Sequence, residues 1–223
     1  MSVRIHPAAF VDPGARLGVD VTIGPGAVIG PDVVIGDRTR VDSHALVTGW
    51  TTLGCDNHVH HGAVLGSAPQ DLKYLGEPSY LVVGDHSVFR EYCTANLATE
   101  PGFTTRIGSH VLMMAYSHVA HNCAIGDRVI LANAVQLAGY VVVDDWAIVG
   151  GGTVVHQFTR IGRHAMIGGG SRISQDIAPY VKAAGSPPRN AGINSIGLAQ
   201  IGKHTSELQS PCNLVCRLLL EKK

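Results

Sequence analysis

Two histidines three residues apart are the side chains of this sequence best suited to acid–base chemistry. They lie in residues 117–123 (SHVAHNC), and a third histidine follows in the pair His156-Gln157. An imidazole changes its protonation state near neutral pH, so it can remove a proton from a hydroxyl group. A backbone N–H group near Gly139 is a plausible donor to an oxyanion. We therefore treat His118, His121 and Gly139 as candidates for one functional site.

A polar loop supplies a second group of candidate residues. The run Gln70-Asp71-Leu72-Lys73-Tyr74 contains a carboxylate and an ammonium group two residues apart. A carboxylate can accept hydrogen bonds from sugar hydroxyl groups, and an ammonium group can pair with a phosphate. We predict that Asp71 and Lys73 bind the polar part of a substrate.

An aliphatic residue at every sixth position indicates the scaffold that must hold these side chains. The series runs without a gap from Ile5 to Leu65, returns at Val83 and Phe89, and continues from Ile107 to Ile173. Glycine often follows the aliphatic residue, which is typical of a short strand followed by a corner. Three hexads make one coil of 18 residues, and successive coils stack at about 4.8 Å, the interstrand spacing. The sequence predicts an all-β, triangular prism of parallel strands.

The same register predicts which residues share an edge of the prism. Counting in steps of 18 carries His121 onto Gly139 and then onto Gln157. The aliphatic and glycine residues are fully explained by the scaffold. Function is therefore expected where the repeat is interrupted or carries polar side chains.

The interruptions of the repeat set the expected boundaries. We predict a β-helix domain over residues 1–180 with inserted loops at 66–82 and 96–106. Residues 181–202 are expected to start a C-terminal helical segment. Residues 203–223 continue no pattern of the body and are interpreted as a non-native tail.

The composition limits the classes of partner. Lys and Arg together number 17, as do Asp and Glu, so the formal net charge is zero and no overall field attracts nucleic acid. No apolar stretch is long enough to cross a membrane, and no signal peptide is evident. The five cysteines are scattered along the chain, which favours reduced thiols. We expect a cytoplasmic protein without stable membrane insertion.

Six motifs resemble those of one acyltransferase family. They are Gln70-Asp71-Leu72-Lys73-Tyr74, Ala120-His121-Asn122-Cys123, Ile130-Leu131-Ala132-Asn133, Leu137-Ala138-Gly139, Val155-His156-Gln157-Phe158 and Asp176-Ile177-Ala178-Pro179-Tyr180-Val181. The family is that of the acyl-carrier-protein:UDP-N-acetylglucosamine 3-O-acyltransferases, which begin lipid A synthesis, and the similarity covers residues 3–200. It implies a left-handed parallel β-helix, a hand that the general preference for right-handed crossovers does not predict.

The resemblance also implies roles for individual residues. In this family a histidine at the position of His121 takes the proton of the sugar 3-hydroxyl, and the N–H group at Gly139 binds the oxyanion. The residues implied to position substrate are Asp71, Lys73, His118, Tyr140, His156, Gln157 and Asn194. The family further implies a homotrimer with its active sites between neighbouring subunits, and no metal or dissociable cofactor.

Two further features bear on the acyl donor. Glycines at 168–170 remove side-chain bulk, so we expect a groove for a long acyl chain beside Gly169. Between Trp146 and Arg189 five basic residues stand against Asp176 alone. Such an excess would attract an acidic partner such as acyl carrier protein.

Several positions differ from the family pattern. Asn122 stands where an aspartate often follows the catalytic histidine. The imidazole therefore lacks the charged residue that would orient it. Tyr140 stands where histidine is common, and residues 96–99 (NLAT) replace a His-Arg-Gly-Thr run. Near the end of the similarity, Ile196 and Gln200 replace an acidic and a basic residue, which weakens the expected nucleotide contacts.

Other functions remain open on the sequence alone. A UDP-sugar N-acyltransferase of the same pathway shares the prism but carries an N-terminal uridine-binding domain, for which hexads beginning at Ile5 leave no room. A γ-type carbonic anhydrase would bind zinc through histidines on adjacent coils, here His118, His121 and His156, but would leave the Asp71-Lys73 loop unused. A non-catalytic scaffold is the third alternative.

Overall fold

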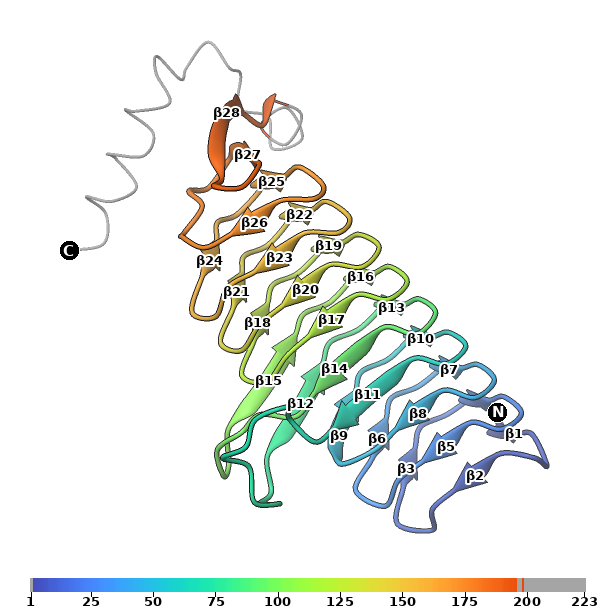
Figure 1. The fold of residues 1–223 in the computed structure, drawn as a ribbon. Helices are drawn as coiled ribbons and strands as arrows, with labels where there is room; N and C mark the ends of the chain where they lie inside the picture. The colour runs from blue at the N-terminus through green and yellow to red at the C-terminus, as the bar shows by residue number, and fades with distance from the viewer. Residues whose placement is uncertain (1, 196–197, 199–223) are drawn as a thin grey trace.

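Three parallel sheets form the walls of a long triangular prism (Figure 1). The computed structural model describes residues 2–195 and 198. The chain passes from one sheet to the next through sharp corners, and each coil adds one strand to each sheet. Figure 1 shows the coils stacked from the N-terminal end to β27 and β28. This is the parallel β-helix that the six-residue period predicts.

We name the sheets A, B and C. Sheet A has the order β1 (Arg4–Ile5), β4 (Thr22–Ile23), β7 (Arg40–Val41), β10 (His58–Val59), β13 (Val88–Phe89), β16 (Leu112–Met113), β19 (Ile130–Leu131), β22 (Ile148–Val149), β25 (Met166–Ile167), β27 (Val181–Ala184) and β28 (Arg189–Ile193). Sheet B has the order β2 (Phe10–Val11), β5 (Val28–Ile29), β8 (Leu46–Val47), β11 (Val64–Ser67), β14 (Thr94–Asn96), β17 (His118–Val119), β20 (Gln136–Leu137), β23 (Val154–Val155) and β26 (Arg172–Ile173). Sheet C contains β3 (Arg16–Leu17), β6 (Val34–Ile35), β9 (Trp50–Leu53), β12 (Tyr80–Val83), β15 (Thr104–Ile107), β18 (Ala124–Ile125), β21 (Val142–Val143) and β24 (Arg160–Ile161).

The periodic aliphatic residues fill the prism. From Ile23 onward they are buried, for example Ile29 at 0% and Ile125 at 4% exposure, because their positions alternate with outward-facing ones along each two-residue strand. Paired strands place residues 18 apart opposite one another, as in Val119↔Leu137 and Leu137↔Val155. The ladder of small and medium aliphatic side chains is the core, and it fixes the register of everything outside it.

The two insertions are shorter than the sequence suggested. Strand β11 continues to Ser67 and β12 begins at Tyr80, so the first loop spans 68–79 rather than 66–82. Strand β15 begins at Thr104, so the second loop spans 97–103 rather than 96–106. The reason is that β12 pairs with both β9 and β15 over four residues, and this backbone pairing extends the strands into the predicted loops.

The sequence predicts a helical segment that starts at residue 181. This prediction is wrong for residues 181–193, which contain two strands. Strand β27 pairs parallel with β25 and extends sheet A, and β28 returns antiparallel to it. Val181 and Ala183 are buried by this pairing, because the open edge of the last coil offers them hydrogen bonds and apolar contact. Helical backbone is seen at Ser195 and Leu198. The predicted tail, residues 203–223, lies outside the described residues, as do Ile196 and Gln200.

Within the described ranges, no helix has the length and apolar character needed to cross a bilayer.

Candidate functional site

The corner between sheets B and C carries the two predicted catalytic residues. His121 follows β17 and Gly139 follows β20. The stacked coils are joined there by hydrogen bonds from the Tyr140 N–H group to the His121 carbonyl (3.0 Å) and from the Phe158 N–H group to the Gly139 carbonyl (3.2 Å). A Cβ atom at Gly139 would lie 2.4 Å from His121 Cε1. The imidazole therefore lies directly against the glycine, as the 18-residue register predicts.

A cavity of about 330 Å³ opens at this corner. It is lined by Gln70, His118, Ala120, His121, Gln136, Leu137, Ala138, Gly139, Val154 and Val155. The lining combines two imidazoles and two side-chain amides with the apolar outer surface of sheet B. A ligand with a polar head and an apolar tail fits such a surface.

The hydrogen bonds of Asn122 decide which nitrogen of His121 is free. The Thr99 N–H group donates to Asn122 Oδ1 (3.0 Å), which identifies that atom as an acceptor. His121 Nδ1 lies 3.0 Å from the same oxygen and must donate to it. Nε2 is then the unprotonated nitrogen of the neutral ring, and its nearest carboxylate oxygen, Asp71 Oδ2, is 3.9 Å away. The free lone pair is the one that a general base needs.

His118 occupies the strand beside this corner. Its Nδ1 lies 2.7 Å from the Thr94 hydroxyl group on the neighbouring strand β14. Burial and the nearby His121 both lower the pKa of His118 below its ordinary value. A neutral, hydrogen-bonded imidazole of this kind can contact substrate without exchanging protons at neutral pH.

The polar loop approaches the cavity from the first insertion. Asp71 Oδ1 accepts a hydrogen bond from the Lys73 N–H group (3.0 Å), which holds a tight turn, and Asp71 Oδ2 faces His121. Lys73 itself is exposed. The structure thus brings Asp71 to the predicted base and leaves the ammonium group of Lys73 in solvent.

Glu100 belongs to the site and was not predicted. The Asn122 side-chain amide donates to Glu100 Oε2 (2.7 Å), and the Tyr140 hydroxyl donates to Glu100 Oε1. A signal was present in the sequence, since Glu100 is the only acidic residue in the second insertion. Its place beside Asn122 depends on the path of a loop, which no repeat pattern specifies.

Tyr140, whose hydroxyl is held by Glu100, does not line the cavity, and neither do four other predicted residues. His156 and Gln157 are exposed, and His156 Nδ1 donates to the Gln157 carbonyl (3.0 Å). Asn194 is 5% exposed, and its amide donates to the His164 carbonyl (2.8 Å). Gly169 lies on the exposed corner after β25, where a Cβ atom would come 3.0 Å from the Gly151 carbonyl oxygen. Their roles in substrate binding stay predictions.

The predicted excess of basic residues is partly neutralised. Arg160 pairs with Asp144 (2.7 Å) and Arg163 with Asp145 (2.8 Å), two carboxylates just outside the range that was counted. The counted range missed them because the coils place residues 16 and 18 apart side by side. The field expected to attract an acidic partner is therefore weaker than the count suggested.

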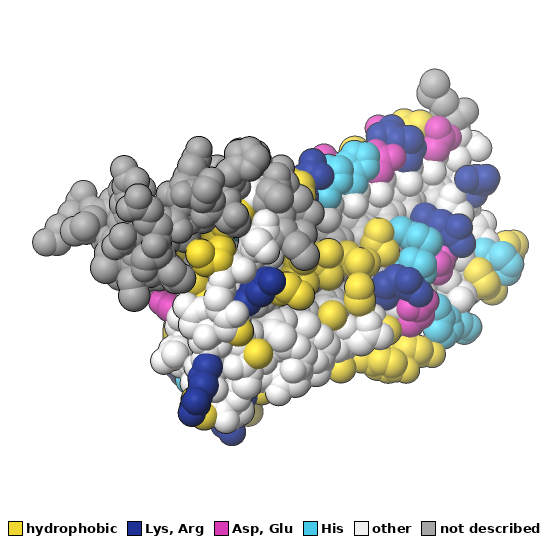
Figure 2. Space-filling model, turned by 90° about the horizontal axis from the view of Figure 1, so that it is seen from above, with side chains coloured by type: hydrophobic (Ala, Val, Ile, Leu, Met, Phe, Trp, Pro, Cys, Tyr) yellow, Lys and Arg dark blue, Asp and Glu magenta, His cyan; other side chains and the backbone are white. Residues whose placement is uncertain are grey.

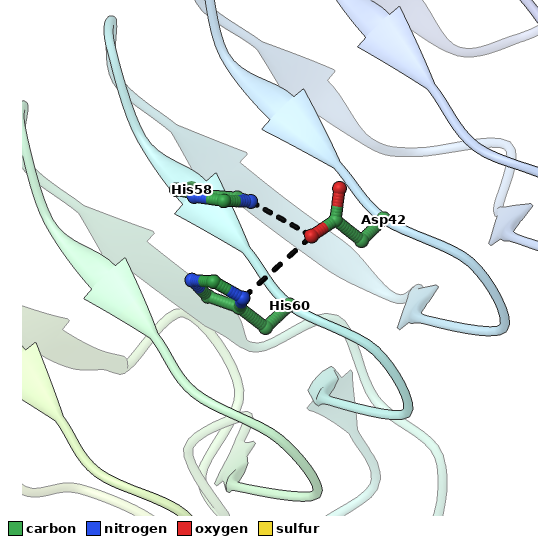
Figure 3. Close-up of side chains that lie close together, drawn as sticks. All are labelled: Asp42, His58 and His60. Carbon is green, nitrogen blue, oxygen red and sulfur yellow. Dashed lines mark hydrogen bonds and ion pairs between the residues drawn. The ribbon is translucent and has the colours of Figure 1, made fainter.

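The arrangement that most resembles a metal site lies away from this cavity. Among the described residues, Asp42, His58 and His60 alone bring three ligand atoms within 4.8 Å of one another (Figure 3). Asp42 Oδ1 already accepts from Arg40 (2.6 Å) and Oδ2 from His58 (2.8 Å), so an ion-pair network accounts for the cluster. Figure 2 shows histidine, basic and acidic side chains mixed over the N-terminal coils of the face it displays.

This result bears on the carbonic anhydrase alternative. In the part of the chain that the structure describes, His118, His121 and His156 do not converge as metal ligands. His118 Nδ1 and His121 Nδ1 have partners on the protein instead. The three predicted histidines therefore form no zinc site within one chain.

Comparison with known proteins gives the same class as the fold. The family described as bacterial transferase hexapeptide (six repeats) matches residues 14–49. Among solved structures, LpxA from Acinetobacter baumannii has a TM-score of 0.86 at 43% identity, covering 89% of this chain and 77% of that one. UDP-N-acetylglucosamine acyltransferase from Francisella novicida has a TM-score of 0.88 at 36% identity, with 92% and 76% covered. The prism is thus the left-handed parallel β-helix of a hexapeptide-repeat transferase, as predicted.

Curated relatives identify the family within this class. The acyl-[acyl-carrier-protein]–UDP-N-acetylglucosamine O-acyltransferase of Thiobacillus denitrificans is 52% identical over 199 residues, covering 89% of this chain and 77% of the relative. The enzyme of the same name from Verminephrobacter eiseniae is 50% identical over 201 residues, covering 89% and 76%. The chain belongs to the family of acyl-[acyl-carrier-protein]–UDP-N-acetylglucosamine O-acyltransferases.

Proposed function

We propose that this enzyme transfers an acyl chain, with or without a 3-hydroxyl group, from acyl carrier protein to the 3-hydroxyl of UDP-N-acetylglucosamine, with His121 as the general base. The reaction is the first step of lipid A biosynthesis, and the named relatives support it. The observation that carries the role of His121 is its free Nε2 in the cavity beside Gly139. No metal or cofactor takes part in the proposed steps.

The proposed chemistry is one proton transfer and one acyl transfer. Nε2 removes the proton of the sugar hydroxyl while its oxygen attacks the thioester carbonyl. The tetrahedral intermediate then expels the thiolate of the carrier, which takes the proton from the imidazolium. A general base contributes roughly two to four decades of rate. One oxyanion donor contributes roughly 3 kcal/mol.

Gly139 is suited to be that donor. Its N–H group donates no hydrogen bond to any described residue, whereas its carbonyl accepts one from the Phe158 N–H group. The missing side chain lets the imidazole lie over the backbone at this point. An oxyanion beside Nε2 would therefore be within reach of both the base and the donor.

Substrate positioning is proposed for the polar residues around this point. Asp71 lies 3.9 Å from the catalytic nitrogen and is placed to hold a sugar hydroxyl. We expect Lys73 to pair with a phosphate, and His118, His156, Gln157 and Asn194 to contact substrate, as the family resemblance implies. Tyr140 contributes its ring rather than its hydroxyl, because the hydroxyl is held by Glu100 and the ring stacks on Phe158 with centroids 4.9 Å apart.

The assembly is part of the proposal. We expect a homotrimer with each active site between neighbouring subunits, because the cavity is an open groove on one prism and several predicted ligands lie outside it. The enzyme is expected in the cytoplasm, where acyl carrier protein and nucleotide sugars meet. Light scattering coupled to size-exclusion chromatography measures the assembly, and a monomeric active enzyme would contradict this part.

Activity measurements test the reaction itself. We expect purified enzyme to acylate UDP-N-acetylglucosamine from acyl carrier protein thioesters and to release one thiol per ester formed. Mass spectrometry of the product, with mild base as a check for an ester, separates O-acylation from N-acylation. Transfer only to a UDP-3-amino sugar would favour the N-acyltransferase alternative. Activity that is lost with a chelator and restored by zinc would favour metal chemistry.

The groove for the acyl chain gives a further prediction. Gly169→Met adds a long side chain on an exposed corner, where the nearest backbone atom to its Cβ is the Gly151 oxygen at 3.0 Å. If the acyl chain passes this corner, the preferred chain should become shorter. A panel of carrier thioesters of increasing length measures the preference, and unchanged turnover with short chains is the internal control. An unaltered length profile would reject the position of the groove.

A further inference from the structure

Two of the departures from the family pattern meet in one hydrogen-bonded chain. His121 Nδ1 donates to Asn122 Oδ1 (3.0 Å), and Asn122 Nδ2 donates to Glu100 Oε2 (2.7 Å). The Tyr140 hydroxyl donates to the other carboxylate oxygen, Glu100 Oε1. Asn122 and Tyr140 are the substituted positions, and Glu100 lies in the insertion whose start is altered. Together they connect the imidazole to a carboxylate.

Two hydrogen bonds fix the orientation of the Asn122 side-chain amide: Oδ1 accepts from the Thr99 N–H group, and Nδ2 donates to the Glu100 carboxylate. The backbone N–H group of Asn122 donates to the Thr105 hydroxyl (2.8 Å), which anchors the residue itself. A flipped amide would set two donors against each other at Thr99 and two acceptors against each other at Glu100. The backbone of Asn122 has φ 59°, a left-handed conformation that asparagine tolerates well. The amide can therefore hold only one tautomer of His121.

Glu100 is charged in this arrangement. The hydrogen bond from Tyr140 is the largest influence and lowers the pKa of Glu100; burial opposes it, and the hydrogen bond from the Asn122 amide lowers the pKa further. The same hydrogen bond raises the pKa of Tyr140 to about 12. A negative charge at the far end of the amide stabilises the imidazolium that forms when Nε2 takes a proton.

We propose that Glu100 is a positioning residue that acts on the base His121 through Asn122, supplying from the second insertion the negative charge that an aspartate at position 122 would provide. The proposal rests on the role of His121 proposed above. It explains the substitutions as one unit: asparagine can bridge two groups, the glutamate carries the charge, and the tyrosine holds the glutamate by its second oxygen.

The other charged or titratable groups around the imidazole are few. Asp71 faces Nε2 from the first insertion at 3.9 Å, and His118 on β17 acts on the same ring electrostatically. Tyr140 on the next coil contacts it edge-on, with ring centroids 5.5 Å apart. Of these, Asp71 is the other carboxylate. It lies on the substrate side, so a change at Glu100 can be separated from one at Asp71.

The test uses the whole 223-residue chain and a charge-swap pair. Glu100→Gln keeps the shape, since the new amide can still accept from Asn122 and contact Tyr140, but it removes the charge. We expect kcat to fall by roughly tenfold to a hundredfold, by analogy with metal-binding histidines that lose the group orienting them. KM for the sugar nucleotide should change little. The acid limb of the pH profile of kcat should move to lower pH, because the imidazolium is less stabilised.

Asn122→Asp should be harmful in the enzyme that keeps Glu100 and beneficial in the E100Q variant. With Glu100 present, two carboxylates meet at the 2.7 Å contact and must share a proton, so this variant should lose stability as the pH rises and that proton leaves. In the E100Q background, the new carboxylate at position 122 carries the charge alone and accepts a hydrogen bond from the new amide at position 100. The double variant E100Q/N122D should therefore regain most of the activity lost in E100Q, together with the wild-type pH profile.

The outcomes separate this proposal from the general-base assignment. A double variant no more active than E100Q, or an E100Q pH profile identical to that of the wild type, would overturn the role of Glu100 even if His121→Ala is inactive. If the activity loss in E100Q is fully explained by partial unfolding, seen as a lower melting temperature, the role of Glu100 would also be overturned. An active His121→Ala enzyme rejects the base itself, whatever E100Q does. Tyr140→Phe is the milder control, since it removes one hydrogen bond and keeps the carboxylate.

Discussion

Replacing His121 with alanine is expected to lower kcat by roughly two decades or more, the usual contribution of a general base. The physical reason is that Nε2 is the unprotonated nitrogen in the cavity, and nothing in the described chain replaces it at that point. Binding of the sugar nucleotide should change little, because the polar loop and the other predicted ligands remain. Steady-state kinetics with the carrier thioester and calorimetric binding of UDP-N-acetylglucosamine measure the two effects separately.

His118→Ala is the matched control for this experiment. His118 lines the same cavity and is also an imidazole, but its Nδ1 is held by Thr94 and its pKa is lowered by burial. Its loss should cost less in kcat and more in KM. Equal losses of kcat in the two variants would contradict the assignment of the proton transfer to His121. Near-wild-type turnover of His121→Ala would reject it outright.

The sequence predicts the fold well because each hexad repeats one physical constraint. An aliphatic residue at every sixth position has only one way to face the interior in every coil, so the core and the strand positions follow directly. The contact of His121 with Gly139 follows too, since no insertion separates Ile107 from Ile173 and the 18-residue register holds across it. The position of the proposed catalytic corner is thus specified by periodicity.

The features that the sequence did not predict lie in segments outside the six-residue repeat. Glu100 reaches Asn122 and Tyr140 across 22 and 40 residues of sequence, and its loop is placed by backbone pairing of β12 with β15. Strand β27 forms because the last coil leaves an open sheet edge, and β28 then pairs with β27; this is a tertiary effect that local sequence does not report. Asn122 was interpreted as a lost charge, whereas the structure places a carboxylate one hydrogen bond beyond it.

Gly139→Ala is expected to be nearly as damaging as the loss of His121. The backbone N–H group remains in this variant, so the effect isolates the space that the glycine provides. The new Cβ would lie 2.4 Å from His121 Cε1 and 2.7 Å from Nε2, distances that require the ring to move. Since a displacement of about 1 Å can cost roughly a hundredfold in rate, we expect kcat to fall by about two decades.

Two measurements show whether this loss has the stated cause. The melting temperature should stay close to that of the wild type, because a rotation of the His121 ring relieves the clash without disturbing the buried aliphatic ladder. The double variant G139A/H121A should be no slower than H121A, because both substitutions remove the same function and their effects do not add. A double variant much slower than H121A would show that Gly139 acts independently of the ring, and a fully active G139A enzyme would reject the close packing of base and backbone.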